Sequence, residues 1–495
     1  MLEYDINELL NQAGFGFWTV KCVIVWIYSV CVTLATYFFI SHRFEIFEQQ
    51  LCSKDFNENN NTTIDYEART PKGNCKEEHV NETFYWVYPV GFCTLAIISS
   101  IIVDIIGRKQ TLIILTVLQI MFTLNLHFMS SLLSVNVIYF AEIILKEVKF
   151  SGIAILLCEL STNSKRARFM YANYSLIFVG NHIVHYADFI IFSHANFAIV
   201  LILAQIVELC LLYRILDNSP RWLLQKHRFK EAAELITKVF NENKSTMQVA
   251  VKEVIKEIST LKLDEASKTC WNKYNLCQLF STKQGAINMI TLSINWYSTE
   301  MHLLLYAEPM ERKSTLLLVV AYLFITAIVY ASQYFTANKF GRKIAFQLAA
   351  IFAFLLSVLL QISVYLIGDN NLFYSLAAFT YICINTSAET GLFLLSVEFL
   401  PTCFRATGTT FALVCGWPFS VINNFLMTHF NGKLIFCTVV APSLFLCLIS
   451  SKFLPETLHK DIPDDIEEYH LSTKTLTVST NKKNVCESAL MASFI

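Results

Sequence analysis

Stretches of about twenty mostly apolar residues recur along this chain, and they constrain its fold more than any other feature. About twelve are present, near 19–40, 84–106, 111–129, 133–157, 168–191, 196–216, 285–306, 315–337, 343–366, 371–393, 407–428 and 432–453. A helix of ~20 residues crosses a hydrocarbon core of about 30 Å. Lipid offers the backbone no hydrogen-bonding partners, so spanning segments are helical. The pattern therefore predicts an all-α polytopic membrane protein.

The composition agrees with burial in lipid. Hydrophobic residues make up 55% of the 495 residues and charged residues only 16%, whereas an average soluble protein has about 25% charged residues. The formal net charge is -1, which does not favour a nucleic-acid partner. The sequence shows no phosphate-binding loop for a nucleotide, no catalytic constellation and no metal-ligand spacing. We therefore expect a protein that is not an enzyme and that needs no cofactor.

Two hydrophilic interruptions, at about 41–83 and 217–284, organise the chain. The second leaves six predicted spans on each side, as expected for two parallel repeats related by an axis along the membrane normal. The predicted domains are a six-helix bundle over 1–216, a cytosolic amphipathic helical loop over 217–284, a second six-helix bundle over 285–455 and a cytosolic tail over 456–495. A solute cavity is expected between the bundles.

Basic residues gather in the connectors on one side of the predicted spans. Arg108, Arg166, Arg221, Arg342 and Arg405 all lie on that side, whereas the opposite connectors 130–134 and 193–196 contain no Lys or Arg. Lys and Arg mark the cytosolic side of a membrane protein. We therefore expect a multi-pass plasma-membrane protein with both termini in the cytosol.

The segment 41–83 is then external. Its Asn-X-Ser/Thr sequons predict N-glycosylation at Asn60, Asn61 and Asn81. Cys52 and Cys75 are the only cysteines of the segment, and an external compartment favours a disulfide between them.

Two connectors repeat one another at matching places in the two halves. One reads Asp104-Ile105-Ile106-Gly107-Arg108-Lys109 and the other Asn338-Lys339-Phe340-Gly341-Arg342-Lys343. Glycine permits a tight left-handed turn, and the cations that follow it lie where they meet carboxylates or helix carboxyl ends. A simple turn with basic flanks is the alternative, but the recurrence favours a shared role.

This pair of connectors resembles the signature loop of the major facilitator superfamily. Three further segments resemble its organic cation, organic anion and carnitine transporter branch: 218–224, Glu398-Phe399-Leu400-Pro401-Thr402 with Arg405, and Leu454-Pro455-Glu456-Thr457. The resemblance runs from about 90 to 470 and implies the major facilitator fold. It departs from the usual pattern at Ile105, where the family has arginine.

The resemblance and the charges together predict a cytosolic gate built from ion pairs. Its candidate residues are Asp104, Gly107, Arg108, Glu159, Arg166, Gly341, Arg342, Glu398 and Arg405. Exposed ion pairs contribute only about 0–1 kcal/mol each, which suits a protein that exchanges two states of nearly equal free energy. The apolar spacing over 220–240 predicts one amphipathic helix beside this gate, with its basic residues facing anionic lipid or solvent.

Ionisable residues inside a span are costly and tend to face a cavity. The candidates for substrate contact are Lys146, Glu147, His182, Trp296, Tyr297, Glu300, His302 and Trp417. Pairing within the bundle is the alternative for the fourth span, because Glu142 and Lys146 lie four residues apart. Glu300 has no adjacent Lys or Arg, and Trp296 or Tyr297 beside it can supply cation–π contacts, so the site favours an organic cation.

These features predict a secondary active or facilitative transporter of small organic ions that works by alternating access. Its expected partners are the solute, membrane lipid and a coupling ion or proton. A carrier of hexoses or other solutes from the same superfamily is one alternative. The other is a non-transporting sensor or scaffold, which the departure at Ile105 and the charged fourth span keep open.

Overall fold

The computed structural model describes residues 16–60, 93–126, 132–191, 197–243, 276–300, 316–367, 372–415, 441–460, 462–464, 466 and 469–470. Regular structure within these ranges is helical, and no strand occurs among them. The all-α prediction is therefore confirmed.

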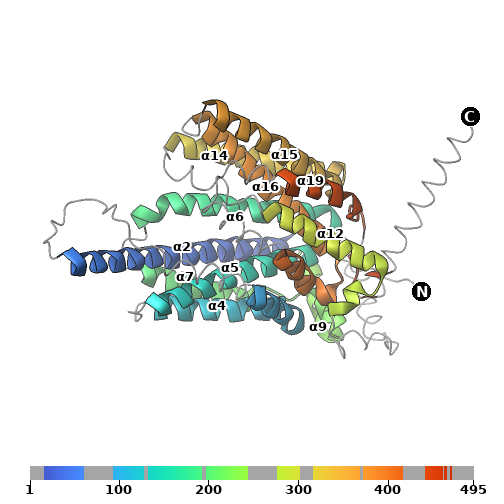
Figure 1. Ribbon diagram of the computed structural model, residues 1–495. Coiled ribbons are helices and arrows are strands. Elements are labelled where there is room, and N and C mark those ends of the chain that lie inside the picture. The colour runs from blue at the N-terminus through green and yellow to red at the C-terminus, as the bar shows by residue number, and fades with distance from the viewer. Residues whose placement is uncertain are drawn as a thin grey trace, which may run out of the picture.

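Each predicted span corresponds to a helix, or to part of one, in the described residues. The N-terminal bundle holds α2 (Phe17–Asn60), the helix Cys93–Ile106, α4 (Arg108–Asn125), α5 (Leu132–Leu160), α6 (Asn163–Ile191) and α7 (Phe197–Arg214). The C-terminal bundle holds α12 (Lys283–Glu300), α14 (Leu316–Lys339), α15 (Arg342–Ile367), α16 (Leu372–Phe399), a helix over 405–415 and α19 (Ala441–Ser450). Short 3-10 helices η2 (Leu276–Phe280), η4 (Thr402–Phe404) and η6 (Ser451–Phe453) join them. In Figure 1, α2, α4, α5 and α7 lie together, α14, α15, α16 and α19 lie together, and α6 runs between the two groups.

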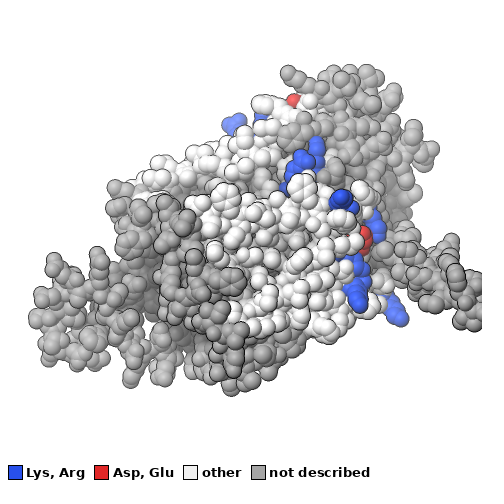
Figure 2. Space-filling model, turned by 90° about the horizontal axis from the view of Figure 1, so that it is seen from above, with Lys and Arg blue, Asp and Glu red and all other residues white. Residues whose placement is uncertain are grey.

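The outer faces of the helices are suited to lipid. Ile24, Leu203, Phe324 and Leu359 are each more than half exposed, on four different helices. In the part of the chain that the structure describes, four helices are long and apolar enough by themselves to cross a membrane: Phe17–Ser41, Phe197–Arg214, Val320–Lys339 and Arg342–Leu360. Figure 2 shows Lys and Arg in a band across the face seen from above, with a broad area of uncharged residues beside it.

Helix α2 is longer than the sequence predicts. The apolar run ends near residue 40, where the external loop was expected to begin, but the helix continues to Asn60 and contains 44 residues. At 1.5 Å per residue it is about 66 Å long, roughly twice the hydrocarbon thickness. Figure 1 shows its later turns extending past the neighbouring helices. Hydropathy marks where lipid ends and does not mark where a helix ends.

The loop after α7 forms two helices instead of the single one predicted. Helix α8 (Pro220–Gln225) begins after Ser219, whose side chain accepts a hydrogen bond from the backbone N–H of Trp222 at 3.3 Å. The chain then turns through His227, which has a positive φ of 57°, before α9 (Phe229–Glu242) begins. The apolar face of α9 packs against Trp18 and Cys22 at the start of α2.

Three basic side chains of this loop contact other side chains of the protein. Lys238 pairs with Asp217 at 2.7 Å, and Arg228 pairs with Glu231 at 2.5 Å. Lys226 lies over the ring of Trp222, 5.7 Å from its centroid. The face that was expected to meet lipid headgroups or solvent is therefore partly neutralised by the protein itself.

Candidate functional site

The two repeated connectors form matching turns. Gly107 has a φ of 111° and Gly341 a φ of 118°, a region that residues with a Cβ rarely adopt. A Cβ at Gly107 would lie 2.8 Å from the Trp222 ring, and one at Gly341 would lie 2.4 Å from a carboxylate oxygen of Glu456. The predicted left-handed turns are confirmed, and a Cβ at either position would be strained and would displace a neighbouring side chain. We call the end of the molecule that carries these turns the basic end.

Three charged side chains join the bundles at the basic end. Arg108 donates to Oε1 of Glu159 at 2.9 Å, and Arg405 donates to the same oxygen at 2.6 Å. Arg108 and Glu159 belong to the N-terminal bundle, whereas Arg405 begins the helix over 405–415 of the other bundle. The carboxylate of Glu159 thus holds a cation from each half of the molecule.

Asp104 makes a second link between the bundles. Its carboxylate accepts hydrogen bonds from the backbone N–H of Ala406 at 3.2 Å and from that of Thr407 at 2.9 Å, and the Thr407 hydroxyl also donates at 2.9 Å. These N–H groups lie in the first turn of the helix over 405–415, where a carboxylate is stabilised by otherwise unpaired donors and by the helix dipole. Arg108 lies 3.3 Å from the same carboxylate.

These pairs are buried, contrary to the expectation of exposed gate residues. The side chains of Asp104, Arg108, Glu159 and Arg405 all have 0% exposure. Removal of one partner from a buried pair costs about 3–5 kcal/mol, against about 0–1 kcal/mol for an exposed pair. The contacts between the bundles therefore close the basic end through charges that would be costly to leave there without a partner.

The matching residues of the second half form their own group. Arg342 Nε lies 3.5 Å from Glu398 Oε2, which also accepts a hydrogen bond from Thr457. Arg166 of α6, which comes from the N-terminal bundle, is fully buried within electrostatic reach of Glu398, so this group also joins the two halves. Glu456 accepts from the backbone N–H groups of Arg342 and Lys343 at 2.8 and 3.1 Å, so it caps the start of α15.

The segment that follows α19 contacts the basic end through Pro463 and Asp464. Pro463 accepts a hydrogen bond from the backbone N–H of Thr402 at 3.1 Å and one from Arg405 at 3.2 Å. Asp464 pairs with Arg221 at 3.1 Å and accepts from the Thr402 hydroxyl at 2.9 Å. Asp464 therefore ties the loop between the bundles to the C-terminal bundle.

Lys226 is a titratable group at the basic end, outside the spans, whose pKa is lowered. The pKa of Lys226 is lowered to about 8, chiefly by burial and also by the positive charge of Arg108, against a smaller opposing effect of Asp104. The ammonium group is thus held beside a second cation at the basic end.

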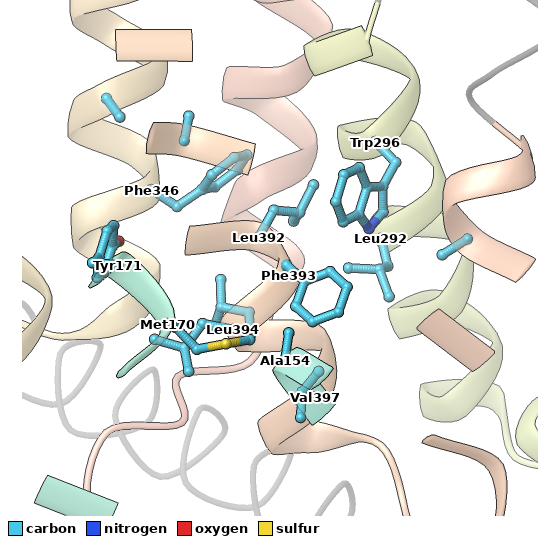
Figure 3. Packing of buried hydrophobic residues seen from close by; sticks show 14 of the residues in the cluster. Ala154, Met170, Tyr171, Leu292, Trp296, Phe346, Leu392, Phe393, Leu394 and Val397 are labelled. Carbon is cyan, nitrogen blue, oxygen red and sulfur yellow. The ribbon is translucent and has the colours of Figure 1, made fainter. Parts of the chain in front are cut away.

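A group of aromatic and acidic side chains lies where the bundles meet. Tyr174 and Phe178 of α6 contact Phe393 and Tyr330 of the C-terminal bundle, with ring centroids 5.5 and 6.2 Å apart. Trp296 of α12 meets Phe393 edge to face at 6.4 Å, and Figure 3 shows the two rings pointing toward one another. We call these residues, together with Glu147 and Glu389, the interbundle cluster.

The two carboxylates of the interbundle cluster come from opposite bundles. Both lie within electrostatic reach of Tyr174. Glu147 of α5 pairs with Lys146 at 3.3 Å and keeps 45% of its side chain exposed. Glu389 of α16 is half-buried and accepts a hydrogen bond from Asn385 at 3.1 Å. Asn385 also donates to the backbone carbonyl of Thr299 at 2.9 Å, so α16 is tied to α12 at the level of the cluster.

The structure places the residues predicted to contact substrate in different surroundings. Trp296 and Glu147 lie in the interbundle cluster, and Tyr297 is half-buried on the same helix as Trp296. Lys146 does not pair with Glu142, because its ammonium lies 3.8 Å from the Tyr37 ring centroid and beside Glu147.

Other predicted residues are placed only in part or not at all. The backbones of Glu300 and His182 lie in α12 and α6, but their side chains are not described. His302, Trp417, Asn61, Asn81 and Cys75 lie outside the described residues, whereas Asn60 and Cys52 lie in the last turns of α2 with no side-chain description.

Sequence reasoning missed Glu389, Tyr174 and Tyr330. Glu389 lies inside a predicted span, so the rule that singled out Glu300 could have found it. The two tyrosines carried no such signal, since aromatic residues in a span are usually packing residues. Only the packing of α6 against α14 and α16 brings them to the carboxylates.

Comparisons with known proteins agree with this architecture. Residues 14–467 match the model of a family described as sugar (and other) transporter. The chain is 24% identical over 377 residues to YfiG of Bacillus subtilis (strain 168), a protein named for metabolite transport. The aligned region covers 71% of this chain and 76% of YfiG.

Solved structures of transporters superpose on the chain over most of its length. The proton:xylose symporter XylE bound to 6-bromo-6-deoxy-D-glucose gives a TM-score of 0.67 at 16% identity, covering 91% of this chain and 98% of XylE. XylE from E. coli in its inward open conformation gives 0.54 at 15% identity, covering 92% and 99%. A bacterial homologue of the iron transporter ferroportin, in an outward-facing state, gives 0.53 at 12% identity, covering 87% and 98%. At such low identities these likenesses show the fold alone.

Proposed function

Because the chain belongs to the sugar (and other) transporter family of the major facilitator superfamily, we propose that it carries a small organic solute across the plasma membrane by alternating access. The observation that carries this proposal is the closure of the basic end. Separation of the bundles there would break the Arg405–Glu159 pair. It would also break the hydrogen bonds that the Asp104 carboxylate accepts from the backbone N–H groups of Ala406 and Thr407. The Arg108–Glu159 pair would survive, because both partners belong to one bundle.

The proposed orientation places the basic end and both termini in the cytosol. Its support is the gathering of Lys and Arg at one end, which marks the cytosolic side. Epitope tags tested on intact and permeabilised cells would locate the 61–83 segment outside and the segment near Arg221 inside. The same cells would test glycosylation at Asn60, Asn61 and Asn81 through a glycosidase-induced mobility shift. They would test the Cys52–Cys75 disulfide through a shift on reduction. Detection of both tags on the same face would end the proposal.

The interbundle cluster supports an organic cation as the solute. Aromatic faces attract cations, with an energy of about 0.5–2 kcal/mol each, and the cluster supplies Trp296, Tyr174 and Tyr330. Tyr174 lies within electrostatic reach of Glu147 and Glu389, and Tyr330 lies within reach of Glu389. Lys146 pairs with Glu147, and its ammonium also lies over the Tyr37 ring. A solute with a positively charged ammonium group would therefore find a complementary site at Glu389.

A sugar is the second candidate, and the comparisons favour it. The matching family is described by sugar transport, and the XylE structure holds a glucose derivative. In the cluster, Glu389 and Asn385 can exchange hydrogen bonds with hydroxyl groups, and an aromatic ring such as Trp296 can cover the apolar face of a sugar.

Uptake of radiolabelled tetraethylammonium and of D-glucose, in the same cells, separates the candidates. We expect saturable tetraethylammonium uptake that falls at least about tenfold in Glu389→Gln, the change expected for a loss of ~1.4 kcal/mol. The matched control is Glu231→Gln, which removes a carboxylate from an exposed pair far from the cluster and should leave uptake unchanged. Uptake of glucose alone would support the sugar carrier instead. No flux of any solute, at normal surface abundance, would favour a sensor or scaffold.

A further inference from the structure

A second group of ionisable side chains lies inside the N-terminal bundle, apart from both the basic end and the interbundle cluster. Gln119 of α4, Glu142 and Lys149 of α5, and Glu208 of α7 each have 0% exposure. Lys149 donates to Glu208 at 2.7 Å and to the side-chain oxygen of Gln119 at 2.7 Å. The amide nitrogen of Gln119 donates to Oε1 of Glu142 at 2.6 Å. Ser29 of α2 donates to Glu208.

The direction of these hydrogen bonds is fixed by chemistry. The ammonium of Lys149 has donors and no acceptor, so the oxygen of Gln119 must face it. The amide N–H₂ of Gln119 must then face Glu142, whose Oε1 acts as acceptor. Any proton on Glu142 therefore resides on its other oxygen, Oε2. That oxygen is buried and has no hydrogen-bond partner in the described residues.

The charges of the group do not balance. One cation, Lys149, lies among two carboxylates, Glu142 and Glu208. Glu208 receives both the ammonium and a hydroxyl donor, whereas Glu142 receives one neutral amide. A buried carboxylate without a partner cation is costly enough that the group takes up a proton instead.

Among the residues whose side chains the structure describes, the surrounding helices supply no further cation to Glu142. The charges within its electrostatic reach are Lys149 and Lys146 on α5 and Glu208 on α7, and α4 contributes the neutral Gln119. Lys146 is held by Glu147 and by the Tyr37 ring of α2. From α2, Tyr28 faces Glu208. We propose that Glu142 is a proton-binding site, at which a proton bound to Oε2 converts the carboxylate to a carboxylic acid while the basic end is closed.

This site has a consequence for transport that rests on the proposed function. Helix α5 carries Glu142, Glu147 of the interbundle cluster and Glu159 of the basic end. A movement of α5 that lets water reach Glu142 would favour loss of the proton, because water stabilises the carboxylate. Solute movement would then be linked to proton binding and release.

Infrared spectroscopy of the purified protein in lipid tests the site without any solute. We expect a carboxylic acid C=O stretching band at neutral pH that disappears in Glu142→Gln. Glu208→Gln should also remove the band. Glu142 is then the one carboxylate left to balance the charge of Lys149, so it loses its proton. The control Glu147→Gln, which changes a half-exposed carboxylate, should retain the band.

The outcomes separate this inference from the transport proposal. A band that persists in Glu142→Gln would overturn the proton site, whatever the uptake assays show. If Glu142→Gln fails to fold, a band that persists in Glu208→Gln would overturn it equally. Wild-type protein that moves neither tetraethylammonium nor D-glucose but loses its band in both variants would refute the proposed function and leave the proton site standing.

Discussion

Glu159 is the carboxylate on which both bundles converge, and its replacement by glutamine tests how the basic end is held closed. In Glu159→Gln, Arg405 and Arg108 would face a neutral amide in a fully buried position. Loss of one partner from a buried pair costs about 3–5 kcal/mol. We take the lower value, because Arg405 keeps its hydrogen bonds to the carbonyls of Leu400 and Pro463. When the bundles separate, water reaches the arginines and most of the penalty disappears.

The closed state should therefore lose about 3 kcal/mol relative to the open state. At 1.4 kcal/mol per factor of ten, this is a rise of roughly 100-fold in the ratio of open to closed molecules. Two native thiols report the change, since Cys158 and Cys403 flank the ion pairs and both have 0% exposure. Peptide-level mass spectrometry after maleimide treatment of the purified protein would give the labelling rate of each. Both rates should rise by up to about 100-fold in Glu159→Gln.

Two controls belong to this experiment. Cys277 is exposed, so its labelling rate should not change. Glu231→Gln breaks an exposed pair with Arg228, which is worth only about 0–1 kcal/mol, and should leave Cys158 and Cys403 protected. The reasoning is refuted if Glu159→Gln folds normally and both thiols label at the wild-type rate.

Three further outcomes are expected. Gly341→Ala should lower the unfolding temperature in detergent, because a φ of 118° strains a residue with a Cβ and that Cβ would displace the carboxylate of Glu456, which caps α15. Gly152→Ala, whose Cβ would meet only Leu112 at 3.7 Å, should not lower it. Lys226→Met should raise the unfolding temperature at pH 7, because it removes a charge whose burial lowers its pKa to about 8. Between about pH 8 and the ordinary lysine pKa near 10.4, Lys226 binds fewer protons in the folded state than in the unfolded state. The stability of the wild type should therefore rise with pH in that window. Unfolding measured over a range of pH values checks the sign, and the rise should be absent in Lys226→Met.

The sequence by itself determined the helical spans, the two glycine turns and the superfamily, whereas the organic cation branch that it suggested is not confirmed by the match to the sugar (and other) transporter family. These features are local, because lipid requires each span to be apolar and long enough regardless of its neighbours. The turns at Gly107 and Gly341 were equally readable, since only glycine tolerates that backbone geometry next to bulky side chains. The structure places the predicted gate residues at the basic end, and their role as a gate stays a prediction. Their individual partners and their burial were not predicted.

Only the tertiary structure decided which charges meet. Arg405 and Glu159 lie 246 residues apart, and no local pattern states that one carboxylate serves a cation from each bundle. The same holds for Glu142, which the spacing in sequence pairs with Lys146, whereas packing of α5 against α4 places Gln119 beside it. Periodicity reports which face of a helix is polar, and the identity of the partner across that face depends on how the helices pack around it.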